Sequence, residues 1–192
     1  MSTCRDLGAK VHLFPWNDNF SDARNAAIDL ATGDWIIFID ADEELTPESG
    51  ANLRQAILNP EVEGYFIKIV NLSGNNDFTE ASTDIVFRLF RNKQEYRFRG
   101  AVHEQIGNVI TEKFDGGKYQ IIEDVVLFHY GCLDKHLKDK EILRHSRILL
   151  EQECSNKPDD LLLRFQHAVE LCRTAEYLAA AWEFKKIADV ET

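Results

Sequence analysis

The chain has 192 residues, enough for one domain of ordinary size or one domain with a small appendage. Hydrophobic residues make up 44% of it and charged residues 29%, which is typical of a folded globular protein and excludes a disordered or collagen-like chain. The net charge of −11 provides no general basic field, so we expect no nucleic-acid polymer as a partner.

No apolar run approaches the roughly 20 residues that span a bilayer, and residues 1–10 lack the apolar core of a signal peptide. We therefore expect a cytoplasmic protein without a membrane span. The cysteines Cys4, Cys132, Cys154 and Cys172 are scattered, with no spacing typical of a zinc cage. This pattern predicts reduced thiols.

The beginning of the chain alternates strand-like and helical patterns. A short apolar run at 9–14 predicts a strand, and residues 21–31 predict a helix with Ser21 as its N-cap. Residues 35–40 form a continuous apolar and β-branched run. Such a run is typical of a parallel strand that is buried on both faces.

A second helix should follow, with Thr46 as its N-cap and Pro47 at its first position, and it should end before Pro60. Beyond it the pattern changes to strands that are separated by Gly, Asn and Asp clusters. These strands are predicted at 65–72, 84–91, 96–103 and 121–130. The sheet is therefore expected to be mixed.

After residue 131 the apolar stripes predict helices to the end of the chain. The last two, at 159–172 and 175–190, are joined by a very short link, and their alanines and aromatic residues resemble one unit of a tetratricopeptide repeat. One unit cannot bury its own face, so the sequence looks cut off at its C-terminus. An ordinary helical hairpin packed on the main domain explains the pattern equally well.

The strongest local signal lies where the run at 35–40 ends in four carboxylates, Asp40, Asp42, Glu43 and Glu44. Open α/β sheets place their ligands at this edge, and acids two residues apart share one face of an extended backbone. Asp40 and Asp42 can thus converge on Mg²⁺ or Mn²⁺, which keeps positions open for phosphate oxygens. A solvated strand end is the alternative. The spacing fits neither an EF-hand nor an HExxH motif.

Six ordered segments carry a family resemblance: NDNFSDARN (17–25), ATGDW (31–35), DADEEL (40–45), RLFRN (88–92), FRGAVHE (98–104) and HYG (129–131). Together they resemble glycosyltransferase family 2. The resemblance implies an α/β fold of the GT-A type, a Rossmann-like mixed sheet, over residues 1–131. A helical tail at 132–192, with the tetratricopeptide-like hairpin at 159–190, would follow it.

The resemblance also implies a metal-dependent reaction, in which a sugar moves from a nucleotide-diphosphate donor to an acceptor nucleophile whose identity the sequence does not reveal. Donor contacts fall on Arg24, Asp34, Asp40 and His103. A divalent cation, Mn²⁺ or Mg²⁺, would be held by Asp42, Asp40 and His129, and it would neutralise charge on the leaving diphosphate. The alternative for His129 is a structural residue whose hydrogen bonds are satisfied within the fold.

Transfer with inversion needs a base that takes the proton from the acceptor. Glu104 is the candidate, because it follows His103 at a predicted strand end. The alternative for Glu104 is a surface acid that pairs with Arg97 or Arg99.

Family members begin with a strand that cradles the nucleotide base, and residues 1–10 instead look like the end of a later helix. We therefore expect an N-terminally incomplete domain that lacks its first nucleotide-binding strands, binds donors weakly and self-associates. Contact between copies, or with a protein partner, would involve the bare sheet edge or the helical tail. An inactive fragment that serves as a protein-interaction module and a metal-dependent phosphohydrolase are the alternative functions.

Overall fold

The structure is a computed structural model that describes residues 2–73, 80–106, 118–131 and 140–190. Its main sheet has five strands in the order β1-β4-β3-β7-β2. These are β1 (Trp35–Ile37), β2 (Glu43–Leu45), β3 (Gly64–Ser73), β4 (Glu80–Arg91) and β7 (Tyr119–His129). Strands β3 and β7 run parallel and the other neighbours antiparallel, so the sheet is mixed, as the sequence predicts.

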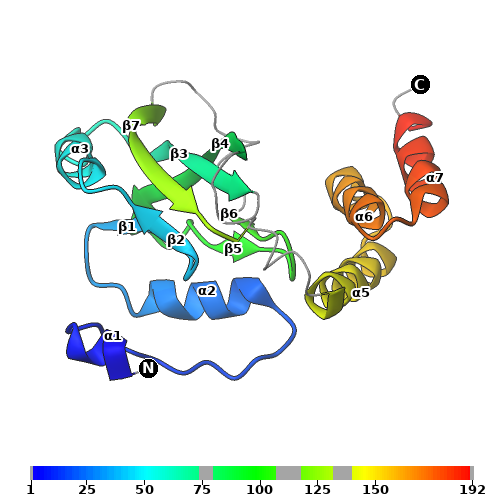
Figure 1. Cartoon of the computed structure of the whole chain (residues 1–192), viewed down its shortest axis with the longest axis horizontal. Coiled ribbons are helices and arrows are strands. Elements are labelled where there is room, and N and C mark those ends of the chain that lie inside the picture. The colour runs from blue at the N-terminus through cyan, green and yellow to red at the C-terminus, as the bar shows by residue number, and fades with distance from the viewer. Residues whose placement is uncertain (1, 74–79, 107–117, 132–139, 191–192) are drawn as a thin grey trace.

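Helices cover the sheet and continue beyond it (Figure 1). The first part of the chain contributes α1 (Ser2–Asp6), α2 (Phe20–Asp29) and α3 (Ser49–Ala56), and a two-stranded sheet of β5 (Phe98–Arg99) and β6 (Gln105–Ile106). The tail consists of α5 (Lys140–Asn156), α6 (Leu161–Arg173) and α7 (Tyr177–Ala188). This arrangement confirms a GT-A-like α/β domain followed by helices.

Successive side chains of β3 point to opposite faces of the sheet, and each face carries a hydrophobic core. Phe66 packs toward α2, β5 and β6, in a cluster that includes Ile28 and Phe90. Ile67, which is fully buried, packs on the other face together with Leu53 of α3. Burial of a large apolar side chain contributes about 1.5–3 kcal/mol, so these two clusters fix the sheet between its helices.

The strand predicted at 9–14 is wrong. These residues form no regular structure, and Leu13 is 76% exposed. Among the described strands, β1 lies at the edge of the sheet and pairs only with β4, so no strand stands where 9–14 would pair. The prediction of a parallel strand at 35–40 that is buried on both faces is also wrong. β1 has three residues, is antiparallel to β4 and buries only Ile36.

Both predicted helix caps are also wrong. α2 begins at Phe20, because the side chain of Asn19 accepts the Asp22 N–H at 3.2 Å. Ser21 is used for a tertiary contact instead, and its hydroxyl donates to the Gly100 carbonyl at 2.6 Å. α3 begins only at Ser49, after a turn in which the Ser49 N–H donates to the Thr46 carbonyl.

The strand predicted at 96–103 is reduced to Phe98–Arg99. The chain turns immediately afterwards, since Gly100 has a φ of +100° and His103 a φ of +52°. Left-handed backbone does not continue a strand. The turn brings residues 100–103 between α2 and the tail.

The tail packs on this turn through Val102, which contacts Leu149 and Leu150 of α5 and Leu163 of α6. Among the described cysteines, Cys4, Cys154 and Cys172 are free thiols, whereas Cys132 lies outside the described residues. Within the described ranges, none of the helices has the length and apolar character that crossing a membrane requires.

Candidate active site

The acidic segment after β1 is held by backbone hydrogen bonds at the end of β7. The Glu43 N–H donates to the Asp40 carbonyl at 3.1 Å, and the Tyr130 N–H donates to the Asp42 carbonyl at 2.9 Å. The pairing of β2 with β7 sets Glu43 opposite His129. Two segments that lie far apart in the sequence therefore meet at one edge of the sheet.

Two arginines and three carboxylates form a paired cluster beside this edge. Asp40 lies 3.0 Å from Arg24 and 3.1 Å from Arg88. Arg88 also binds Glu43 at 2.6 Å, and Arg24 forms an ion pair with Glu104. Glu43 and Glu104 are almost entirely shielded from solvent, at 2% and 10% exposure, and buried carboxylates persist as charges only when they are paired in this way.

Aromatic rings fix the direction of the Arg24 guanidinium. Its central carbon lies 4.1 Å from the centre of the Phe38 ring and 5.2 Å from that of Phe98. These contacts are cation–π interactions, which strengthen as the site is desolvated. Two buried nitrogens of the cluster make no hydrogen bond in the described part of the chain: Arg88 Nε, and Arg24 Nη1, which has only its 3.0 Å ion-pair contact with Asp40. Buried donors in this state are suited to an anionic ligand.

Asp42 and His129 form a second group next to the cluster. His129 Nε2 lies 3.4 Å from Asp42 Oδ2, and both side chains are partly exposed. Gly131 leaves space for them, because a Cβ there would collide with the Asp42 carboxylate and lie 2.6 Å from His129 Nε2. A carboxylate oxygen and an imidazole nitrogen are donors that a divalent transition-metal ion accepts, so this pair fits the expected cation.

The predicted ligand set of Asp40, Asp42 and His129 is only partly brought together. The Asp40 carboxylate is directed to Arg24 and Arg88 instead. Within the described ranges, no three acidic, histidine or cysteine side chains form a metal cage by themselves. Asp42 and His129 are thus the two candidate ligands that the fold assembles.

Two predicted donor contacts lie elsewhere. Asp34 is exposed at the start of β1, at the end opposite to Asp40, and its carbonyl accepts the Asn92 N–H at 2.9 Å. His103 turns toward the tail, where its Nε2 lies 3.6 Å from the buried Glu170 of α6. This contact lowers the pKa of the Glu170 carboxyl. The donor roles of Asp34 and His103 remain predictions.

Glu104 has an ion-pair partner other than Arg97, one of the two arginines that the alternative interpretation names. Arg97 binds Asp29 of α2 at 2.8 Å, and Glu104 pairs with Arg24 rather than with Arg97. Glu104 therefore belongs to the charged cluster and not to an isolated strand surface.

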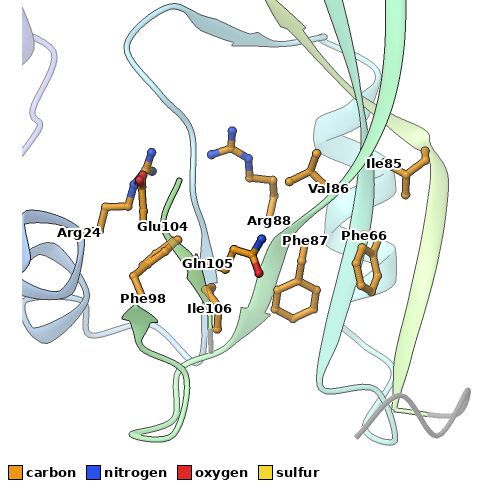
Figure 2. Close-up of a pocket in the computed structure, with 10 residues that line it drawn as sticks. All are labelled: Arg24, Phe66, Ile85, Val86, Phe87, Arg88, Phe98, Glu104, Gln105 and Ile106. Atoms are coloured by element: carbon orange, nitrogen blue, oxygen red, sulfur yellow. The ribbon is translucent and has the colours of Figure 1, made fainter. Parts of the chain in front are cut away.

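A pocket of about 230 Å³ opens beside Glu104 (Figure 2). The Arg24 and Arg88 guanidiniums and the Glu104 carboxylate lie at one end of the view, and the Phe66 and Phe87 rings lie farther along β3 and β4. The full lining consists of Arg24, Phe66, Ile85, Val86, Phe87, Arg88, Phe98, Glu104, Gln105 and Ile106. Charged groups at one end of a mostly apolar pocket can orient a polar ligand atom.

Comparison with known proteins places this arrangement in a family. Residues 2–121, more than half of the chain, match the family model for glycosyl transferase family 2. The chain belongs to glycosyl transferase family 2. Five of the six motif segments that carry the resemblance, from 17–25 to 98–104, lie within the matched region, and the sixth, at 129–131, follows it.

Two curated relatives extend the comparison. The chain is 32% identical over 162 residues to a TPR repeat-containing protein of Synechococcus elongatus, and the aligned region covers 82% of this chain and 39% of the relative. It is 33% identical over 145 residues to the SPbeta prophage-derived glycosyltransferase SunS of Bacillus subtilis, which covers 76% of this chain and 33% of that protein. The chain therefore spans between a third and two fifths of the length of these relatives.

Sequence reasoning missed the roles of Arg88 and Glu43 in this family 2 site. It counted Glu43 only among the four acids that follow the run at 35–40, whereas Glu43 binds Arg88 from the first residue of β2. A signal for Arg88 was present. A cation inside an otherwise apolar strand needs a buried partner, and the acids after β1 were the available ones.

Proposed function

We propose that this chain carries the catalytic centre of a metal-dependent glycosyltransferase, which moves a sugar from a nucleotide-diphosphate donor to an acceptor nucleophile with inversion. Family membership supports the class of reaction. The observation that carries the proposal is the meeting of the Asp42–His129 pair and the Arg24–Arg88–Asp40 cluster at one edge of the sheet. Candidate metal ligands and buried cations are thus adjacent, as a diphosphate leaving group requires.

In this proposal Asp42 and His129 hold the divalent cation. When bound, the cation neutralises the charge that develops on the diphosphate as it leaves. An imidazole nitrogen in the donor set favours Mn²⁺ over Mg²⁺, since Mg²⁺ selects oxygen ligands and keeps several waters. The space at Gly131 keeps both ligands close to each other.

The arginine cluster binds and orients the donor. Arg88 Nε is a buried donor that a diphosphate oxygen can satisfy, and the Arg24 guanidinium adds a second positive charge beside it. Asp40, fixed by both guanidiniums and 32% exposed, is placed to accept hydrogen bonds from the hydroxyl groups of the ribose or the sugar. The two arginines thereby position the donor through direct contacts and through Asp40.

Glu104 acts as the base. Its carboxylate stands at the charged end of the pocket drawn in Figure 2, where the acceptor would bring its nucleophile. The proton moves from the acceptor atom to a Glu104 oxygen as the bond to the anomeric carbon forms. The apolar side chains farther along the pocket favour an acceptor with an apolar portion next to that nucleophile.

A protein-interaction role of the tail accompanies this activity. Helices α6 and α7 expose large apolar side chains, among them Phe165, Leu178 and Trp182. Exposed apolar residues that gather on one part of a molecule favour contact with a second copy or with a protein partner. The name of the TPR repeat-containing relative agrees with the tetratricopeptide-like pattern of these helices.

The test is a product assay on the purified chain with Mn²⁺, a panel of nucleotide-diphosphate sugars and candidate acceptors, read by mass spectrometry. The proposal predicts acceptor molecules that gain the mass of one sugar residue, together with free nucleoside diphosphate. Release of inorganic phosphate without sugar transfer would identify a phosphohydrolase instead. Donor turnover that is the same with Mn²⁺ and with a chelator would exclude the metal-dependent reaction.

A further inference from the structure

Four polar side chains form a row across one end of the sheet. Asp84 lies on β4, Asn71 on β3 and His129 on β7, and Asp42 immediately precedes β2. The strand register explains the row, since Asn71 is directly opposite His129 on β7 and its partner on β4 is Ser82, two residues from Asp84. Side chains two residues apart share one face of a strand, so the row lies on one face of the sheet.

Hydrogen bonds connect the row from end to end. Asn71 Nδ2 donates to Asp84 Oδ2 at 2.7 Å, and Asn71 Oδ1 lies 2.7 Å from His129 Nδ1. His129 Nε2 then lies 3.4 Å from Asp42 Oδ2. The opposite orientation of the amide would set the Asn71 oxygen against the Asp84 carboxylate, where two acceptors repel each other.

This connectivity determines which ring nitrogen of His129 carries the proton. The amide oxygen of Asn71 can only accept, so His129 Nδ1 must be the donor of the 2.7 Å hydrogen bond. In a neutral imidazole the other nitrogen, Nε2, then carries the lone pair. Nε2 is the nitrogen that faces Asp42 and the space at Gly131, and without a cation the Asp42 carboxylate, which is 51% exposed, can turn away from this lone pair into solvent.

We infer that Asn71, oriented by Asp84, is a positioning residue that fixes His129 in the Nδ1–H tautomer and so presents the Nε2 lone pair beside Asp42 as a metal ligand. An imidazole in water favours the opposite tautomer, so Asn71 acts against the intrinsic preference of the ring. Groups that hold a metal-ligating histidine in this way typically change metal affinity by 10–100-fold when they are removed. The inference rests on the proposed function only for the use of the lone pair.

The first readout is the tautomer itself, measured without metal. ¹⁵N NMR of the imidazole at pH about 8.5, with His129 assigned by its loss in His129→Gln, should find the proton on Nδ1 in the wild-type chain. Asn71→Leu should move the proton toward Nε2. The double variant Asn71→Asp/Asp84→Asn exchanges donor and acceptor within the row and should restore Nδ1–H, because the new carboxylate accepts from both neighbours.

The second readout is Mn²⁺ affinity, measured by calorimetry or by electron paramagnetic resonance. Asn71→Leu should weaken binding 10–100-fold, and the double variant should return it to within a few-fold of the wild-type value. Ser82→Ala is the matched control. Ser82 lies opposite Asn71 on β4, but its hydroxyl is 3.5 Å from the Asn71 amide nitrogen, a much longer contact than the 2.7 Å hydrogen bond to Asp84. This variant should leave Mn²⁺ affinity unchanged.

The outcomes separate this inference from the proposed function. Wild-type chain that binds no Mn²⁺ but changes tautomer in Asn71→Leu would refute the metal site and support the positioning role. Nδ1–H retained in Asn71→Leu, or unchanged Mn²⁺ affinity in that variant, would overturn the inference. Should Asn71→Leu not fold, the more exposed Asp84→Ala frees the amide to turn, and a mixture of tautomers is then expected.

Discussion

Gly131→Ala is the substitution that most directly probes the paired ligands. The new Cβ would lie 2.6 Å from His129 Nε2, whereas ordinary van der Waals contact begins at 3.4 Å, so the ring must move by about 0.8 Å or the Asp42 carboxylate must turn away. Metal–ligand distances tolerate changes of about 0.2 Å. We therefore expect Mn²⁺ affinity to fall at least 10-fold, or about 1.4 kcal/mol.

The fold should tolerate this change, because His129 is 26% and Asp42 51% exposed and both can move into solvent. Gly50→Ala is the matched control. Gly50 is the second residue of α3 and has nothing within 4 Å of the added Cβ, so alanine should stabilise the helix by at most about 0.5–1 kcal/mol and leave Mn²⁺ binding unchanged. Calorimetry with Mn²⁺ and urea unfolding measure the two quantities. Equal Mn²⁺ affinity in Gly131→Ala and the wild-type chain would refute the assignment of Asp42 and His129.

Two further predictions concern the base and the pH dependence of stability. Glu104→Gln should lower turnover by roughly 10²–10⁴-fold in the product assay while donor binding is retained, and a loss of only a few-fold would assign the base elsewhere. Hydrogen bonds from Lys93 and Tyr96, at 2.8 and 2.7 Å, lower the pKa of the Glu63 carboxyl below 4.5. Glu63 therefore stabilises the fold above pH 4.5, and this contribution is lost as the pH falls through the lowered pKa. Glu63→Gln should cost about 1 kcal/mol in urea unfolding at pH 7 and much less near pH 3, so a difference that does not change with pH would contradict this reasoning.

The spacing of apolar residues predicted the helices and strands that bury one face or one stripe of their own side chains. The helices of the tail and the strands β3, β4 and β7 follow from apolar spacing, because one face or stripe of each must be buried. The failures are of a different kind. Residues 35–40 look like a central strand, but β1 lies at the edge among the strands that the structure describes, and this position is decided by strand pairing, which an apolar run does not encode.

The same distinction between local sequence pattern and long-range strand pairing applies to the candidate site. The acids at 40–44 mark a ligand edge in the sequence alone, because carboxylates seldom follow a buried run without a positive partner. The partners themselves come from pairing over long separations. Arg88 reaches Asp40 through the β1–β4 ladder, and His129 reaches Asp42 through the β2–β7 ladder. Asn71 carries no local signal and is found only through its register with His129.

The thermal stability of the wild-type chain and of Asp42→Ala, each measured with Mn²⁺, a nucleoside diphosphate, both or neither, tests directly whether Asp42 helps to bind a metal-dependent donor. A ligand present at 100 times its Kd stabilises the native state by about 2.7 kcal/mol. We expect the wild-type chain to be stabilised most by Mn²⁺ and the diphosphate together, and Asp42→Ala to lose this joint effect while its unliganded stability is unchanged. The same joint stabilisation in Asp42→Ala would contradict a metal-dependent donor site at this edge of the sheet.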